Sequence, residues 1–197
     1  AENEGNKNLQ GVALIMQAVG FQTLTDLYGP VPFTEAVNAE ILQPAYDSEE
    51  VVYEGIIELL TSADNLLSSN EGEIFASSDL FYSGDAVKWR KLANSLKFRA
   101  LMRISSTRNV GAELQALTNK IFTSNDDSAQ LMYLSAPADA NPIFQTIVDG
   151  NRSEYKVNSV LVELLNSLND DRLEVMAGKN DSEVILGMGE PPQPGDA

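Results

Sequence analysis

The side chains of this sequence that could do chemistry are carboxylates, guanidinium groups and aromatic rings, because the chain contains no histidine and no cysteine. Ser-His-Asp and Cys-His catalysis, disulfides and metal sites built on imidazole or thiolate are therefore excluded within it. Paired acids could hydrolyse glycosidic bonds, which requires two carboxyl groups at a set separation. However, 29 Asp and Glu residues among 197 produce such pairs by chance, and no pair stands out. We expect no catalytic residue and no cofactor.

The segment from 149 to 155 holds the best candidate ligand-binding group, which is Asn151, Arg152 and Tyr155. Amide and guanidinium groups hydrogen-bond to hydroxyls, and a tyrosine ring can cover the apolar face of a pyranose. Sugar-binding sites combine these two chemistries. A structural role for the arginine and the tyrosine is the alternative.

Two acidic stretches have a loose similarity to calcium-binding loops. In the first, residues 149–160, Glu154 stands where an EF-hand needs glycine and Val160 where it needs glutamate. The second, residues 125–128, has the composition of a helix cap. We expect no metal site at either place.

The basic residues are concentrated in one segment of an otherwise acidic chain. Seven of the 13 Lys and Arg residues lie between Lys88 and Arg108, whereas the whole chain has a net charge of −16. On a helix these charges do not share a face, as a helix that binds nucleic acid or lipid would require, but lie between two apolar stripes. Residues 8–87 contain acids and no basic side chain. We predict that Arg99 or Arg103 pairs with carboxylates of the preceding helices, such as Glu54, Glu58 or Asp64. A basic arm that grips an acidic partner is the alternative, and we expect no nucleic-acid partner.

Two segments in the first half of the chain have apolar side chains at helical spacing. Residues 8–28 form one helix, which should end at Tyr28-Gly29-Pro30 because glycine and proline stop a helix. The next should begin at Asp47, because Asp47-Ser48-Glu49-Glu50 has the pattern of a capping box. The predicted core face of the first helix is Leu9, Val12, Met16, Val19, Thr23 and Leu27. That of the second is Val52, Ile56, Leu60, Ala63 and Leu67.

Three more helices are predicted after residue 84. Asp85 should cap a helix that runs to about Thr107, in which Trp89 is expected to pack in the core rather than stack on a ligand. Asn109 should cap a fourth helix, and residues 158–168 should form a fifth. The predicted core face of the fifth is Leu161, Leu164, Leu165 and Leu168. No segment alternates apolar and polar residues with the period of a strand.

The fold class is therefore all-α, and Trp89-x-x-Leu92-Ala93-x-x-Leu96 is similar to the opening of a tetratricopeptide helix. We predict stacked helical hairpins with an irregular loop region and no significant sheet. Residues 1–123 should form the helical scaffold. Residues 124–197 should add irregular loops and one or two helices to the same domain, truncated at its C-terminus. No run approaches the roughly 20 apolar residues of a membrane span.

An ordered set of motifs resembles the SusD-like (SusD/RagB) outer-membrane nutrient-binding lipoproteins of Bacteroidetes. The family patterns "GDIPY.EA", "P.YD…VY..I…L..A" and "Y.GD..KW.KFANSLRLR…R" are matched by residues 29–36, 44–63 and 82–103. The patterns "NPFFQ", "R.DY" and "DPRL" are followed by residues 141–145, 152–155 and 169–173. Two positions depart from the family, with Pro30 in place of Asp and Asp171 in place of Pro. Family members also extend beyond both ends, with a lipobox cysteine and a long C-terminal region, so the chain looks like an internal piece.

The resemblance implies a surface-exposed lipoprotein that captures glycans and passes them to a SusC-like TonB-dependent transporter without catalysis. It also implies that the helical scaffold packs against the transporter while loops contact the ligand. The rival hypothesis is a helical-repeat scaffold that binds a protein and no sugar. A carboxylate-dependent hydrolase is a third.

Overall fold

The computed structural model describes residues 5–133, 136, 139–150, 152 and 157–176. The chain divides into two compact units, residues 1–132 and residues 133–197. Each is described by itself. The predicted division after residue 123 stays a prediction.

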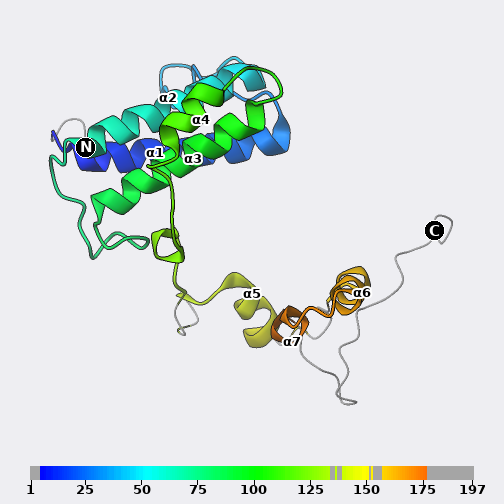
Figure 1. Ribbon diagram of the computed structural model, residues 1–197. Helices are drawn as coiled ribbons and strands as arrows, with labels where there is room; N and C mark the ends of the chain where they lie inside the picture. Colours follow the sequence, from blue (N-terminus) through cyan, green and yellow to red (C-terminus); the bar gives the residue numbers. More distant parts are fainter. Residues whose placement is uncertain (1–4, 134–135, 137–138, 151, 153–156, 177–197) are drawn as a thin grey trace. The chain divides into compact units, whose positions relative to one another are not determined.

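Long helices make up the first unit. They are α1 (Lys7–Tyr28), α2 (Glu49–Ser68), α3 (Ala86–Ile104) and the shorter α4 (Gly111–Leu117). Successive helices run in alternating directions and each packs against the next (Figure 1). The described residues contain no strand, and Val31 and Asp47 form an isolated antiparallel bridge. The all-α class and the stacked hairpins are confirmed.

Short polar side chains begin most of these helices, because they accept from the unpaired N–H groups of the first turn. Asn6 accepts from Leu9 N at the start of α1, and Asp85 caps α3 as predicted. At α4 the N-cap position is Val110, although Asn109 accepts from the N–H of Gly111 one residue beyond it.

The predicted cap of α2 is wrong by one residue. Ser48, and not Asp47, accepts from the N–H of Val51. The Asp47 carboxylate instead accepts from Phe33 N at 3.0 Å and from Thr34 N at 2.7 Å. It thereby closes the connector between α1 and α2, and these hydrogen bonds hold the pKa of Asp47 below its ordinary value despite the opposing effect of burial.

The core of the first unit lies on α2. The residues predicted to form its apolar face, Val52 to Leu67 at helical spacing, are all buried, as are Ala93, Ala100 and Leu101 of α3. Both α1 and α3 pack mainly against α2, and α1 and α3 also contact each other directly through Gln22 with Arg99 and Asp26 with Arg103.

The buried face of α1 is shifted from the predicted one by about one residue, roughly a third of a turn, although Val12 and Val19 of the predicted face are partly buried and pack against the core. The buried residues are Asn8, Gly11, Ile15, Ala18, Phe21, Gln22 and Thr25, whereas Met16 and Leu27 are exposed. Gly11 allows close approach to α2, because a Cβ there would lie 2.6 Å from Cγ of Leu67. Two of the buried polar side chains have clear partners: Gln22 Oε1 accepts from Arg99 at 2.7 Å, and the Thr25 hydroxyl donates to the Gly29 carbonyl at 2.9 Å.

Trp89 lies in the core, as predicted from its position on the apolar face of the helix, and only 3% of its surface is exposed. Its ring makes edge-on contacts with Phe81 and Tyr82. Its Nε1 donates to Oδ2 of Asp79 at 2.8 Å. The same carboxylate accepts from the backbone N–H groups of Phe81, Tyr82 and Gly84, so one acid fixes both the indole and the loop before α3.

The second unit contains α5 (Pro142–Phe144), which continues into a π-helical turn over Gln145–Asp149, then α6 (Ser159–Ser167) and α7 (Arg172–Met176). Its small core is Val162 and Leu165 of α6 with Leu173 of α7. Of the predicted core face of α6, only Leu165 is buried; the other three leucines are exposed. The five-residue α7 covers a narrower strip than the leucine pattern suggested.

Candidate functional site: a charged pocket at the ends of α2 and α3

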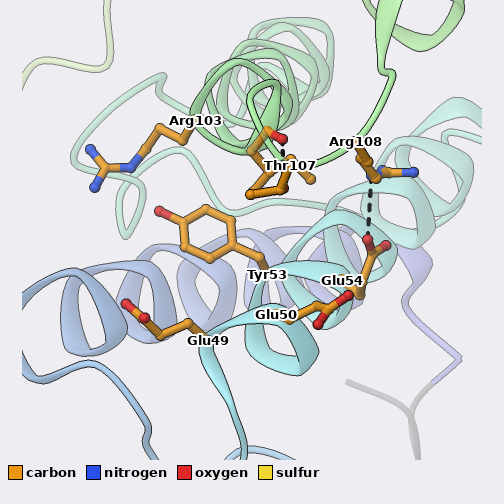
Figure 2. Close-up of a pocket in the computed structure, with 8 residues that line it drawn as sticks. Glu49, Glu50, Tyr53, Glu54, Arg103, Thr107 and Arg108 are labelled. Atoms are coloured by element: carbon orange, nitrogen blue, oxygen red, sulfur yellow. Dashed lines mark hydrogen bonds and ion pairs between the residues drawn. The ribbon is translucent and has the colours of Figure 1, made fainter.

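The first turns of α2 and the last turns of α3 enclose a pocket of about 370 Å³ (Figure 2). Because the two helices run in opposite directions, the acidic start of one meets the basic end of the other. The lining residues are Glu49, Glu50, Tyr53, Glu54, Arg103, Ile104, Thr107 and Arg108. The pocket is therefore built from carboxylates, guanidinium groups, one phenol and one threonine.

The carboxylates follow directly from the capping of α2. Because Ser48 is the N-cap, Glu49 and Glu50 fall in the first turn, where negative charge is favoured by the helix dipole. Both are exposed. Glu54, one turn further, lies 3.4 Å from Nε of Arg108, and Nη2 of Arg108 lies 3.3 Å from Glu113 of α4. Glu54 is therefore engaged by Arg108, whereas Glu49 and Glu50 make no hydrogen bond or ion pair among the described residues.

Tyr53 forms the floor of the pocket and is held by a hydrogen-bonded group behind it. Its hydroxyl donates to Oδ1 of Asp26 at 2.5 Å, and Nη2 of Arg103 lies 3.0 Å from the same oxygen. Burial, followed by the hydrogen bond to Asp26, raises the pKa of Tyr53. Since only 8% of this residue is exposed, its ring does not offer a free face for stacking on a ligand.

The charge pairing predicted for the basic segment is confirmed by Arg103, which pairs with an acid of a preceding helix, while the acids Asp64 and Glu54 named as examples pair with Arg90 and Arg108. Arginines of α3 do pair with acids of α1 and α2: Arg90 Nε lies 3.0 Å from Asp64, and Arg103 pairs with Asp26. The partner of Arg103 comes from α1 rather than α2. Arg99 binds the Gln22 amide instead of a carboxylate, because the buried face of α1 carries that glutamine.

The sequence-predicted ligand group lies in the second unit. Asn151 and Tyr155 are outside the described residues. Arg152 is exposed, and its backbone N–H donates to the carbonyl of Ile147 at 3.0 Å. The role assigned to these three residues stays a prediction.

The acidic stretch at 125–128 is a short 3₁₀ turn capped by Ser124 and Asp127. Asp127 accepts from Thr123 and binds Lys91 at 2.7 Å, so its oxygens are occupied by protein donors. Within the described parts of the chain, no three Asp or Glu residues are grouped so that they could hold a metal ion. None of the described helices is both long enough and apolar enough to cross a membrane.

Sequence reasoning did not find the pocket. The capping pattern at 47–50 and the basic end of α3 were both visible, but nothing in either segment shows that antiparallel packing brings them together. Chemically, the pocket presents hydrogen-bond acceptors from the outer glutamates and donors from two arginines in one hollow. This combination suits a ligand rich in hydroxyl groups.

Stacked antiparallel helices with ordered connectors and a polar pocket at one end define a tetratricopeptide-like binding scaffold. A model of the SusD-like proteins, described as starch-binding and associating with the outer membrane, matches residues 1–190. The chain belongs to this SusD-like family.

Solved structures of SusD homologues have the same fold. One from Bacteroides fragilis is 26% identical with a TM-score of 0.81, over 92% of this chain and 40% of that protein. A SusD/RagB family protein from Bacteroides thetaiotaomicron is 28% identical with a TM-score of 0.74, over 86% and 35%. A chitin-binding SusD homologue from Flavobacterium johnsoniae, at 24% identity and a TM-score of 0.70, over 83% and 35%, shows a shared fold alone. The chain thus spans about two fifths of the length of such proteins. No curated protein matches it significantly.

Proposed function

We propose that this chain is the helical part of a non-catalytic protein that captures glycans at the cell surface for a SusC-like TonB-dependent transporter. The observation that carries the proposal is the family match over residues 1–190, whose description is starch-binding and outer-membrane association. In this proposal the protein is a surface-exposed lipoprotein of the outer membrane.

Two groups of side chains are proposed to contact the glycan. The first is the pocket between α2 and α3, where the open carboxylates of Glu49 and Glu50 accept from sugar hydroxyls. The second is Asn151, Arg152 and Tyr155, whose amide, guanidinium and ring have the chemistry of a sugar site. The two groups are tested separately because they lie in different units of the chain.

Isothermal titration with starch-derived and other plant and host polysaccharides tests capture. We expect at least one neutral glycan to bind the wild-type chain, and Glu50→Gln or Arg152→Gln to weaken it about tenfold if the corresponding group contacts the sugar. Glu58→Gln is the matched control, because Glu58 is exposed on the same helix and does not line the pocket. Release of reducing ends from any glycan of the panel would contradict the non-catalytic part of the proposal.

A protein-binding scaffold that contacts no sugar is the second candidate function. It is favoured by the end of α1, where Leu27 and Tyr28 are 69% and 73% exposed. Co-purification with the transporter after Leu27→Ser and Tyr28→Ser tests it. Loss of the transporter together with absence of binding to every glycan would favour the scaffold over glycan capture.

A further inference from the structure

A second cavity, of about 220 Å³, lies where α2, α3 and α4 meet, and it shares no lining residue with the proposed glycan pocket. It is polar in composition. Its lining residues are Thr61, Asp64, Asn65, Asn94, Lys97, Glu113, Ala116, Leu117 and Lys120.

The acids of this cavity are neutralised by arginines that come from outside it. Asp64 accepts from Nε of Arg90 and from Nδ2 of Asn94, both at 3.0 Å. Glu113 lies 3.3 Å from Nη2 of Arg108. Each of these two carboxylates therefore already has an arginine as its ion-pair partner.

The two lysines of the cavity have no such partner. Among the described residues, no carboxylate lies within ion-pair distance of Lys97 or Lys120, although the chain as a whole has a net charge of −16. The lining itself carries two acids and two lysines, but Arg90 and Arg108 pair with the two acids from outside the lining and leave the lysine charges without an ion pair. This arrangement attracts an anion.

Lys97 is the more constrained of the two. It is half-buried, and its Nζ donates to the hydroxyl of Thr61 at 2.8 Å, which leaves two N–H groups for another acceptor. Burial lowers the pKa of Lys97, although Glu113 and Asp64 oppose the shift, and the nearby charge of Lys120 adds to it. A bound anion would stabilise the protonated form of Lys97 and offset its repulsion by Lys120.

We propose that this cavity binds a small oxyanion, a carboxylate, sulfate or phosphate group, between Lys97 and Lys120. Thr61 and Asn65 supply further polar contacts on the α2 side. The oxyanion belongs either to a free inorganic ion or to an acidic sugar. Both sources present negatively charged oxygens that can accept hydrogen bonds from the ammonium groups.

Titration calorimetry of the whole chain, at ionic strength held constant with sodium chloride, distinguishes these sources. Sodium sulfate, sodium phosphate and sodium glucuronate are the three probes. We expect at least one to bind the wild-type chain and Lys120→Gln to weaken that binding about tenfold, the usual effect of losing a hydrogen bond to a charged group. Binding of glucuronate alone would identify an acidic sugar, and binding of sulfate or phosphate alone a free ion.

Lys88→Gln is the control for loss of one positive charge, because Lys88 lies on α3 as Lys97 does, has no carboxylate partner among the described residues and does not line the cavity. Lys120 is exposed, so its substitution does not threaten the fold. The proposal is overturned if none of the three anions binds the wild-type chain, or if Lys88→Gln weakens binding as much as Lys120→Gln.

Discussion

Replacing Asp79 by alanine should destabilise the scaffold more than the loss of any exposed acid. The Asp79 carboxylate accepts four hydrogen bonds, from Trp89 Nε1 and Gly84 N at 2.8 Å, Phe81 N at 3.0 Å and Tyr82 N at 3.1 Å. Trp89 and Tyr82 are buried, so water cannot readily replace the lost acceptor there. The substitution leaves four donors without their partner at the loop that leads into α3.

The magnitude follows from these four bonds. At about 1 kcal/mol each, their loss sums to about 4 kcal/mol. Removing the carboxylate also relieves its own desolvation, which opposes the hydrogen bonds in setting its pKa. We therefore expect Asp79→Ala to lower the free energy of unfolding by 2–4 kcal/mol, roughly a third of the stability of an ordinary domain. Asp79→Asn, which keeps one acceptor oxygen, should cost about half as much.

Urea unfolding followed by fluorescence measures this directly, because Trp89 is the only tryptophan of the chain. Far-UV circular dichroism checks that the helices unfold in the same transition. Asp126→Ala is the control for charge, since Asp126 is exposed and no hydrogen bond to its carboxylate is present among the described residues. If the free energies of unfolding of Asp79→Ala and Asp126→Ala lie within about 0.5 kcal/mol of each other, the four hydrogen bonds to Asp79 do not contribute the expected stability.

Three further predictions concern the loss of stability at low pH and two glycines. The hydrogen bond from Lys91, followed by that from the N–H of Thr123, lowers the pKa of Asp127 from 3.8 to about 2. The stability that this acid contributes is therefore present above pH 3.8 and is lost as the pH falls toward 2. Asp127→Asn should flatten the pH dependence of the urea midpoint in that range, and an unchanged slope would contradict the assignment. Gly84→Ala should destabilise by about 2 kcal/mol or more, because φ is 88° and a Cβ would lie 2.5 Å from the Ile74 carbonyl oxygen. Gly20→Ala, in open space on α1, should instead stabilise by about 0.5–1 kcal/mol in the same denaturation assay, and equal shifts for the two variants would refute this.

The sequence predicted the elements of the first unit well because their signals are local. Apolar spacing located α2 and its whole buried face, and Asp85 marked the start of α3. The cap of α2 was misplaced because Asp47 and Ser48 are both good caps, and the choice between them depends on a connector that folds back from Phe33. A short stretch of sequence around the cap does not show that a distant backbone segment competes for the Asp47 carboxylate.

The face of α1 and the candidate pocket could not be predicted for a different reason. Gln22 and Thr25 are buried polar residues, and only the partners that satisfy them, Arg99 and the Gly29 carbonyl, explain their position. Hydrophobic periodicity counts such residues as surface. The pocket likewise requires the antiparallel packing of α2 on α3, which places Glu50 near Arg103 although they are far apart in sequence.

The separation of charges along the chain also bears on the order in which the scaffold is synthesised. The hairpin of α1 and α2 leaves the ribosome first, and between residues 8 and 87 its only charged side chains are acidic. The arginines that pair with Asp26, Glu54 and Asp64 are synthesised later, in α3 and the turn after it. Until then the carboxylates of the nascent hairpin repel one another, and the hairpin lacks α3, which completes its core. We infer that it completes folding only when α3 has emerged, so that three helices, rather than one repeat at a time, form the smallest stable folding unit.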